Sequence, residues 1–213
     1  MDLETAIRGR RSVRRFTDEP VAEDTLRELL DLARWSPSWA NTQSWSVLVA
    51  TGATLAKIKS AIASAAETKA ERRFELPAPN PDWPAHLRAR TQQLIQARQA
   101  ATGQSSPAPS ADLFGAPCAV YLAVDQRLRP EYACYDAGLF TQTLCLAAHG
   151  KGLGTCIMAS AIGYPEILHE LLPAAADKRF VIGVALGHPD PGAAVNRFER
   201  ARAGLDELVS FAR

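Results

Sequence analysis

The spacing of apolar residues predicts five helices along this chain of 213 residues. In the clearest of them, apolar positions from Leu26 to Ala33 recur at the i, i+3, i+4, i+7 intervals that line one face of an α-helix. The predicted helices span residues 3–10, 22–35, 53–66, 85–101 and 131–149. We expect the last helix to end at Gly150, because glycine readily adopts the left-handed conformation that closes many helices.

Short apolar runs between these helices predict the strands of a central sheet. The predicted strands are Trp45–Thr51, Cys118–Val124 and Phe180–Leu186, with a shorter extended segment at Thr155–Met158. The first run is almost continuously apolar, so we expect it to be covered on both faces. Because several helices separate successive strands, the pattern favours an α+β fold over a doubly wound parallel sheet.

Residues 77–112 differ from the rest of the chain in composition. They hold six of its fourteen prolines, on either side of the helix predicted at 85–101. We interpret this segment as a helix-containing insertion within a single domain of residues 1–213, not as a domain of its own. Two roles fit it equally well: a gate over a substrate, or an arm that wraps around a partner subunit.

Composition excludes several classes of protein. Lysine and arginine number 24 and aspartate and glutamate 23, so the net charge of +1 argues against a nucleic-acid partner. No run approaches the ~20 apolar residues of a membrane span, and the first residues do not resemble a signal peptide. We therefore expect a cytoplasmic protein. Four cysteines without a C-x-x-C pair and four scattered histidines predict buried free thiols and no metal site.

The small net charge conceals an uneven distribution of arginine. Five arginines fall within Arg8–Arg15, and three more, Arg197, Arg200 and Arg202, lie near the C-terminus. One interpretation is a solvated basic helix end. The other is a site for a small anion, because the planar guanidinium group suits a phosphate.

A second polar segment, residues 36–45, places Asn41 and Gln43 between Trp39 and Trp45. It is either an ordinary polar loop or a site for a planar heteroaromatic ligand, which needs amides for edge hydrogen bonds and indoles for stacking.

Four motifs in order along the chain resemble those of the FMN-dependent nitroreductase family, and the insertion resembles its nitrobenzoate-reductase-like branch. The motifs are Arg10–Arg14 (RRSVR), Pro37–Trp45 (PSWANTQSW), Gly152–Cys156 (GLGTC) and the segment from Gly187 to Arg202. Ser44 stands where the family usually has proline. The resemblance implies a nitroreductase-like α+β fold with a central mixed or antiparallel sheet flanked by helices. It also implies an intertwined homodimer with FMN at the subunit interface.

The resemblance also implies roles for individual residues. The FMN phosphate and ribityl chain would be held by Arg10, Arg11, Ser12, Arg200 and Arg202. Arg14 would lie near the N1/O2 side of the flavin ring. The partner subunit would contribute Pro37, Ser38, Trp39, Asn41 and Gln43. The flavin N5/O4 edge would face the backbone of Met158, Ala159 and Ser160, where Ala159-Ser160 departs from the family's usual Glu-Gly or Gly-Gly. Trp39 and Phe114 would form walls of a pocket for a small aromatic acceptor.

The implied activity is transfer of hydride from NADPH or NADH, through flavin N5, to nitroaromatic or quinone-like acceptors by a ping-pong mechanism. FMN would carry the chemistry, so we expect no catalytic side chain. Three alternatives stay open. They are a relative with other flavin chemistry (dehalogenation, ene reduction or flavin fragmentation), a flavin-binding or storage protein without turnover, and a basic nucleic-acid-binding module, which the charge disfavours.

Overall fold

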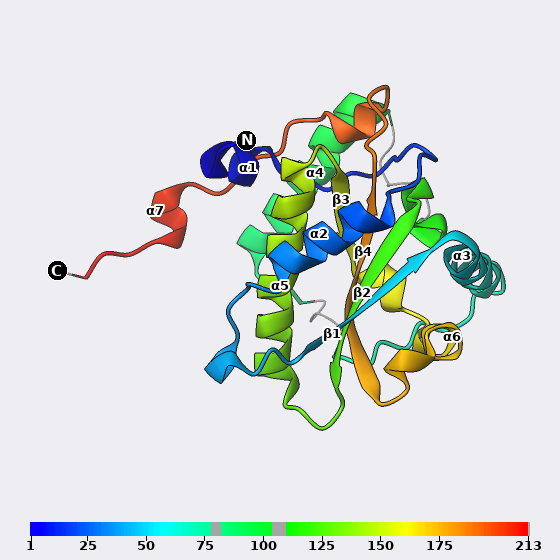
Figure 1. The fold of residues 1–213 in the computed structure, drawn as a ribbon. Helices are drawn as coiled ribbons and strands as arrows, with labels where there is room; N and C mark the ends of the chain where they lie inside the picture. Colours follow the sequence, from blue (N-terminus) through cyan, green and yellow to red (C-terminus); the bar gives the residue numbers. More distant parts are fainter. Residues whose placement is uncertain (78–81, 104–109, 213) are drawn as a thin grey trace.

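A four-stranded sheet lies between two layers of helices in the computed structural model, which describes residues 1–77, 82–103 and 110–212 (Figure 1). The helices are α1 (Leu3–Gly9), α2 (Glu23–Ala33), α3 (Gly52–Glu67), α4 (Ala85–Thr102), α5 (Pro130–Gly150), α6 (Pro165–Leu171) and α7 (Leu205–Leu208). The strands are β1 (Trp45–Thr51), β2 (Cys118–Asp125), β3 (Gly154–Met158) and β4 (Lys178–Gly187). All five predicted helices and all four extended segments are confirmed, as is the α+β class. Among the described helices, none combines the length and apolarity needed to cross a bilayer.

The sheet is antiparallel throughout, in the order β1-β2-β4-β3. The strand β2 is buried along almost its whole length, as its unbroken apolar sequence predicts. The prediction that β1 is covered on both faces is wrong. This strand lies at an edge, and beyond Leu48 its residues alternate between buried and exposed, with Val49 37% exposed. Apolar β-branched residues suit any strand, so composition did not reveal that only one face of this edge is covered.

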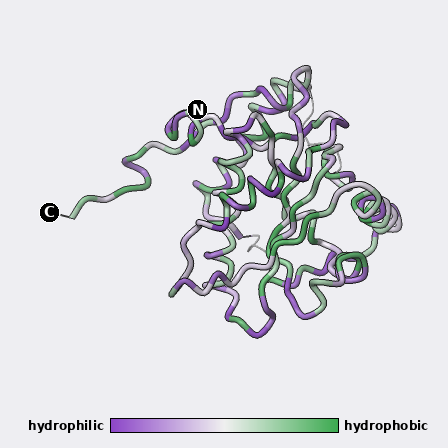
Figure 2. Tube along the Cα trace, viewed as in Figure 1, coloured by the Kyte–Doolittle hydropathy of each residue, from purple (hydrophilic) through white to green (hydrophobic). Residues whose placement is uncertain are grey.

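Each face of the sheet has its own core. On one face α2 and α5 pack with Leu29 and Phe140 against β2. On the other, α3 and α6 cover Tyr121 and Phe180, whose rings meet edge-on at 6.1 Å. Successive residues of a strand point to opposite faces, so the two cores share the central strands. Figure 2 shows this apolar centre within a more hydrophilic periphery.

The predicted insertion does contain a helix, α4, and the structure adds what it contacts. Arg98 is its buried residue, and the helix packs against the short 3₁₀ turn η5 (Ala194–Asn196) near the C-terminal arginines. Within the proline-rich flanks, residues 78–81 and 104–109 lie outside the described residues.

The helix α5 ends at Gly150, as predicted, but Gly150 is not the left-handed residue that closes it. Gly152, not Gly150, adopts the left-handed conformation, with φ of +79°. The amides of Gly152 and Leu153 donate to the carbonyls of His149 (3.0 Å) and Ala148 (2.9 Å), which is the paired closure of a Schellman motif. Both glycines fit the helix-end pattern, and only the backbone path selects the second.

Glycine is required at position 183 of β4, where the next layer lies very close. A Cβ atom there would lie 2.6 Å from the Cβ of Ala161 and 3.3 Å from the ring of Tyr121. We expect Gly183→Ala to lower the free energy of unfolding by about 1–3 kcal/mol through overpacking. At Gly138, in α5, a Cβ would meet nothing within 4 Å. Gly138→Ala should therefore raise the free energy of unfolding by about 0.5–1 kcal/mol. Urea unfolding of both variants checks this pair, and equal shifts would contradict the packing argument.

Candidate functional site

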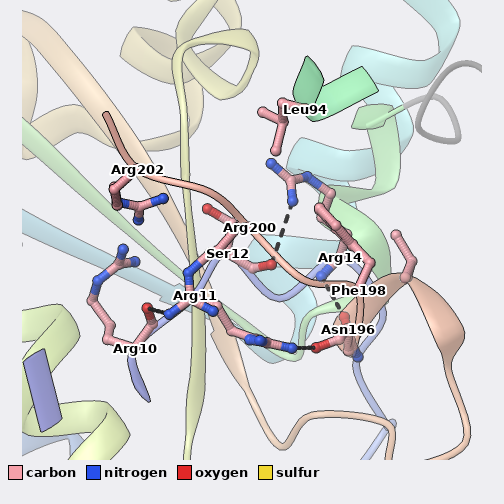
Figure 3. Close-up of a pocket in the computed structure, with 10 residues that line it drawn as sticks. Arg10, Arg11, Ser12, Arg14, Leu94, Asn196, Phe198, Arg200 and Arg202 are labelled. Atoms are coloured by element: carbon pink, nitrogen blue, oxygen red, sulfur yellow. Dashed lines mark hydrogen bonds between the residues drawn. The ribbon is translucent and has the colours of Figure 1, made fainter. Parts of the chain in front are cut away.

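A pocket of about 150 Å³ brings the two arginine groups of the sequence together (Figure 3). Its lining residues are Arg10, Arg11, Ser12, Arg14, Leu94, Val195, Asn196, Phe198, Arg200 and Arg202. All six residues predicted for the phosphate, ribityl and N1/O2 side line this one pocket. None of these lining residues is acidic, so five guanidinium groups surround a space with no internal counter-charge.

The N-terminal half of the pocket is held against β3. The amide of Val13 donates to the carbonyl of Thr155 at 2.9 Å, and Ser12 pairs with Thr155 as a parallel bridge. Gly154 permits this approach, because a Cβ there would lie 2.6 Å from a methyl carbon of Val13. The conformation of residues 10–14 therefore depends on the glycine that opens β3.

Asn196 joins the N-terminal arginine segment to the C-terminal one. Its Oδ1 accepts from the amide of Arg14 at 2.8 Å, and its Nδ2 donates to the carbonyls of Arg15 at 2.8 Å and Asp190 at 3.2 Å. Its own carbonyl accepts from Nη1 of Arg11 at 2.5 Å. The side chain is buried. Sequence reasoning included Asn196 in a motif but gave it no role, since its partners Arg11, Arg14 and Arg15 lie about 180 residues away.

The arginines of the pocket divide into two kinds. Arg200 is partly structural, because its Nη2 donates to the carbonyls of Arg8 (2.7 Å), Gly9 (3.2 Å) and Arg10 (2.5 Å) at the end of α1. Arg10 and Arg202 direct their guanidinium groups toward one another (Figure 3), and the backbone bond of Arg202 is a local one, from Nη1 to the carbonyl of Ala201 at 2.9 Å. Burial, and then the charges of its arginine neighbours, lowers the pKa of Arg200. A bound anion would relieve this repulsion.

His149 belongs to the same cluster and was missed by sequence reasoning. It lies in the last turn of α5 and packs on Gly9, where a Cβ would approach its Nε2 to 2.5 Å. Burial, followed by the charges of Arg10, Arg200 and Arg11, lowers its pKa. The sequence around His149 does not indicate this neighbourhood, because the arginines come close to His149 only in the folded chain.

The loop predicted to carry Pro37, Ser38, Trp39, Asn41 and Gln43 is held by hydrogen bonds in an uncommon conformation. Ala40, Asn41 and Gln43 all have positive φ, between 48° and 57°. Non-glycine residues rarely adopt such angles, and clusters of them often mark functional sites. The hydroxyl of Ser38 accepts from the amide of Gln43 at 2.9 Å.

The buried carboxylate of Asp136 in α5 anchors this loop. It accepts from the amide of Trp39 at 3.1 Å and from the hydroxyl of Ser44 at 3.4 Å. Sequence reasoning did not identify Asp136, because it lies more than 90 residues further along the chain. The indole of Trp39 is 68% exposed, beside the exposed rings of Tyr132 and Tyr135 in a largely apolar groove.

The loop and the arginine pocket lie at opposite ends of α5. Asp136 holds the loop and His149 lies beside the arginines, so at 1.5 Å per residue the two anchors are about 20 Å apart along the helix. One chain therefore does not bring these two groups of predicted residues into one pocket.

The third predicted group lies where β3 ends. Met158 is the last residue of β3, and Ala159 and Ser160 open the 3₁₀ turn η3 (Ala159–Ile162). The Ser160 hydroxyl lies 2.9 Å from that of Ser110.

The side chain of Phe114 packs into the core beneath the sheet and is 8% exposed. Its role as a pocket wall stays a prediction.

Comparison with known proteins gives a consistent result. The family model described as "Nitroreductase family" matches residues 7–188. The chain is 29% identical to 4-nitrobenzoate reductase of Pseudomonas putida, covering 99% of this chain and 95% of the relative. It is 31% identical to nitroreductase NfnB of Mycolicibacterium smegmatis, covering 99% and 92%.

Solved structures agree with these relatives. The FMN-dependent nitroreductase NfnB from Mycobacterium smegmatis, in complex with NADPH, superposes with a TM-score of 0.90 at 29% identity, covering 99% of this chain and 97% of that one. An FMN- and NADPH-dependent NfnB from a Sphingopyxis strain gives 0.92 at 26% identity over the whole of both chains. The predicted nitroreductase-like fold is confirmed, and its sheet is antiparallel.

We expect Asn196→Ala to lower the free energy of unfolding by about 1–3 kcal/mol, because it removes the acceptor of the Arg14 amide and the side-chain bonds to the carbonyls of Arg15 and Asp190. Gln92→Ala is the control, since Gln92 is exposed on α4 and its replacement should change the free energy of unfolding by less than about 0.5 kcal/mol. Denaturant unfolding measures both. A small effect at Asn196 would show that the termini do not depend on this side chain.

The lowered pKa of His149 predicts a pH-dependent stability. The folded chain favours the neutral ring, whereas the unfolded chain takes up a proton near the ordinary pKa of 6.5. Stability from this residue is therefore complete above pH 6.5 and is lost as the pH falls below it. His149→Gln should flatten the loss between pH 7 and pH 5 relative to the unmodified protein. Parallel unfolding profiles for the two proteins would contradict this assignment.

Proposed function

Because the chain belongs to the nitroreductase family, we propose that it is an FMN-dependent oxidoreductase that passes hydride from NADPH or NADH to nitroaromatic acceptors. The observation that carries this proposal is the pocket of five arginines without an acidic lining residue. Such a donor set suits a phosphate dianion, which guanidinium groups bind through paired, charge-assisted hydrogen bonds.

The residues present fit FMN in this place. Arg10, Arg11, Ser12, Arg200 and Arg202 would hold the phosphate and the ribityl chain. Arg10 and Arg202 would bind the phosphate most directly, because Arg200 and Arg11 join distant backbone segments, whereas Arg202 donates to the carbonyl of the adjacent Ala201. Arg14 would place a cation at the N1/O2 side of the ring, where it stabilises negative charge.

When bound, FMN supplies the redox chemistry, with N5 as the atom that exchanges hydride with the nicotinamide and the acceptor. The chain orients the ring and adjusts its electrostatics. Met158, Ala159 and Ser160 would face the N5/O4 edge from the end of β3. No side chain is assigned as an acid, base or nucleophile.

We propose that the working unit is a homodimer. In one chain the loop at Pro37–Gln43 and the arginine pocket lie at opposite ends of α5, so the loop of a second copy is needed to complete the site. Exposed apolar side chains support an interface. They include Trp39, Tyr132 and Tyr135 near the loop, and Leu205, Leu208 and Phe211 in the C-terminal segment that leads away from the body of the chain (Figure 1).

The acceptor is proposed to be a flat, electron-poor aromatic compound. Relatives named 4-nitrobenzoate reductase and NfnB support nitroaromatic compounds, and quinones share the same planarity and electron demand. The nicotinamide and the acceptor would use one face of the ring in turn, in a ping-pong sequence, with Trp39 and Phe114 as walls. Free thiols at all four cysteines fit the reducing cytoplasm, where we place the protein.

The purified protein should be yellow with stoichiometric FMN, and NADPH or NADH should bleach it under anaerobic conditions. A nitroaromatic compound should then restore the colour, and parallel lines in double-reciprocal kinetics would support the ping-pong sequence. A protein that stays colourless with added FMN would refute the proposal. A yellow protein that neither nucleotide bleaches would favour flavin storage or fragmentation.

Replacing Arg10 and Arg202 together with alanine should release FMN while the chain stays folded. Each charge-assisted contact contributes about 1.5–3 kcal/mol, so each loss should weaken FMN binding at least about tenfold. Fluorescence titration with FMN measures the affinity. Arg27→Ala is the control, since Arg27 pairs with Glu23 on the exposed face of α2. Stoichiometric flavin in the double variant would show that the phosphate lies elsewhere.

A further inference from the structure

We propose that Ser110 and Ser160 form a reversible hydroxyl pair at the reactive edge of FMN. In this pair Ser160 contacts N5, and Ser110 is the positioning residue that sets the Ser160 hydroxyl. The inference rests on the proposed function, because it places the N5/O4 edge at Met158–Ser160.

The first observation is the contact itself. The two Oγ atoms are 2.9 Å apart in a partly buried position, and either hydroxyl can be the donor. This separation is normal for an O–H···O hydrogen bond. The contact joins two elements distant in sequence: Ser160 lies in η3, and Ser110 begins the 3₁₀ segment η2 (Ser110–Gly115) at the end of the insertion.

The second observation is that the backbone around Ser160 is held from two sides. Below it, Gly183 of β4 has no side chain, so Ala161 packs directly on the sheet. At the end of η3, the carbonyl of Gly163 accepts from the amide of Arg73 at 2.9 Å. With the backbone fixed in this way, rotation about χ1 is the freedom left to the Ser160 hydroxyl, and Ser110 restricts it.

The element that carries Ser110 is also anchored. Leu113 and Phe114 hold positive φ angles of 54° and 60°, and the amide of Phe114 donates to Asp112 at 3.0 Å. Just beyond η2, Nζ of Lys59 donates to the carbonyl of Ala116 at 2.6 Å. Such a strained backbone persists only where its surroundings define it closely. Ser110 therefore has a defined position from which to orient Ser160.

The chemistry of N5 explains why a pair is useful. Oxidised FMN offers a lone pair at N5, and reduced FMN offers an N–H there, so the contacting group must donate in one state and accept in the other. A hydroxyl can do both, provided that its remaining hydrogen-bonding capacity has a partner. When Ser160 donates to N5 it can accept from Ser110. When Ser160 accepts from N5 it can donate to Ser110.

The hydroxyl pair gives the Ala159-Ser160 sequence a specific role at the flavin edge. Backbone amides alone are donors and suit the oxidised state better than the reduced one. A side-chain hydroxyl with its own partner satisfies N5 in both states. In this chain the end of the insertion supplies that partner, which links the insertion to the hydride-transfer edge.

The test compares the affinity for oxidised FMN with the anaerobically measured affinity for reduced FMN. Ser110→Ala and Ser160→Ala should each change the ratio of the two dissociation constants by about three- to tenfold, the effect of one hydrogen bond. The double variant should show the same change as the single variants, because the two hydroxyls act as a unit. Ser110→Thr keeps a hydroxyl, so the ratio in this variant should equal that of the unmodified protein. Ser60→Ala, on the exposed face of α3, should leave it unchanged.

The outcomes distinguish a failure of the hydroxyl-pair inference from a failure of the proposed function on which it rests. If the unmodified protein binds no FMN, both fail. If it binds FMN and is bleached by NADPH or NADH, but the ratio is unchanged in Ser160→Ala, only the hydroxyl pair is refuted. Additive effects in the double variant would also refute it. Thermal unfolding identifies a destabilised Ser110→Ala, in which case Ser160→Ala and Ser110→Thr decide the question.

Discussion

The site depends on one hydrogen-bonded side chain, Asn196. Its side-chain amide joins the backbone of Arg14 and Arg15 to the C-terminal segment, and its backbone carbonyl accepts a hydrogen bond from Arg11. Several guanidinium groups repel one another when they are brought into one pocket, so neutral hydrogen bonds must hold them there. Asn196 supplies these bonds without adding a negative charge that would compete with an anionic ligand. The same two segments are also joined at the end of α1, through Arg200.

The strand β3 connects this anion pocket to the proposed hydride-transfer edge. Its first residues pair with Ser12 and Val13, and its last residue leads into η3. The span from Thr155 to Met158 is about 10 Å at the rise of an extended strand. Both ends rely on glycine: Gly154 admits Val13 at one, and Gly183 of the neighbouring strand admits Ala161 at the other. A rigid strand thus sets the spacing between the proposed phosphate site and the proposed ring-edge site, as pre-organised binding requires.

Periodicity and motif spacing were sufficient for most of the architecture. Helices such as α2 and strands such as β2 have patterns that admit one interpretation, and the structure confirms them. The failures arose where two positions had the same local chemistry. Gly150 and Gly152 are equally suited to the left-handed position that closes a helix, and β1 has the composition of a buried strand although it lies at an edge. Local sequence contains no information on what packs against a segment from elsewhere in the chain.

By itself, the sequence determined which chemical groups were available: a surplus of arginine at two distant places, a polar loop between indoles, and glycines at the entry to β3. Tertiary structure alone decided which of them meet. It brought Arg10, Arg202 and Asn196 into one pocket, placed His149 within reach of the arginine charges, and set Ser110 against Ser160. It also kept the loop held by Asp136 away from that pocket within one chain. The reason is physical, since side-chain type is a local property, whereas charge repulsion and hydrogen bonding depend on distances that only folding creates.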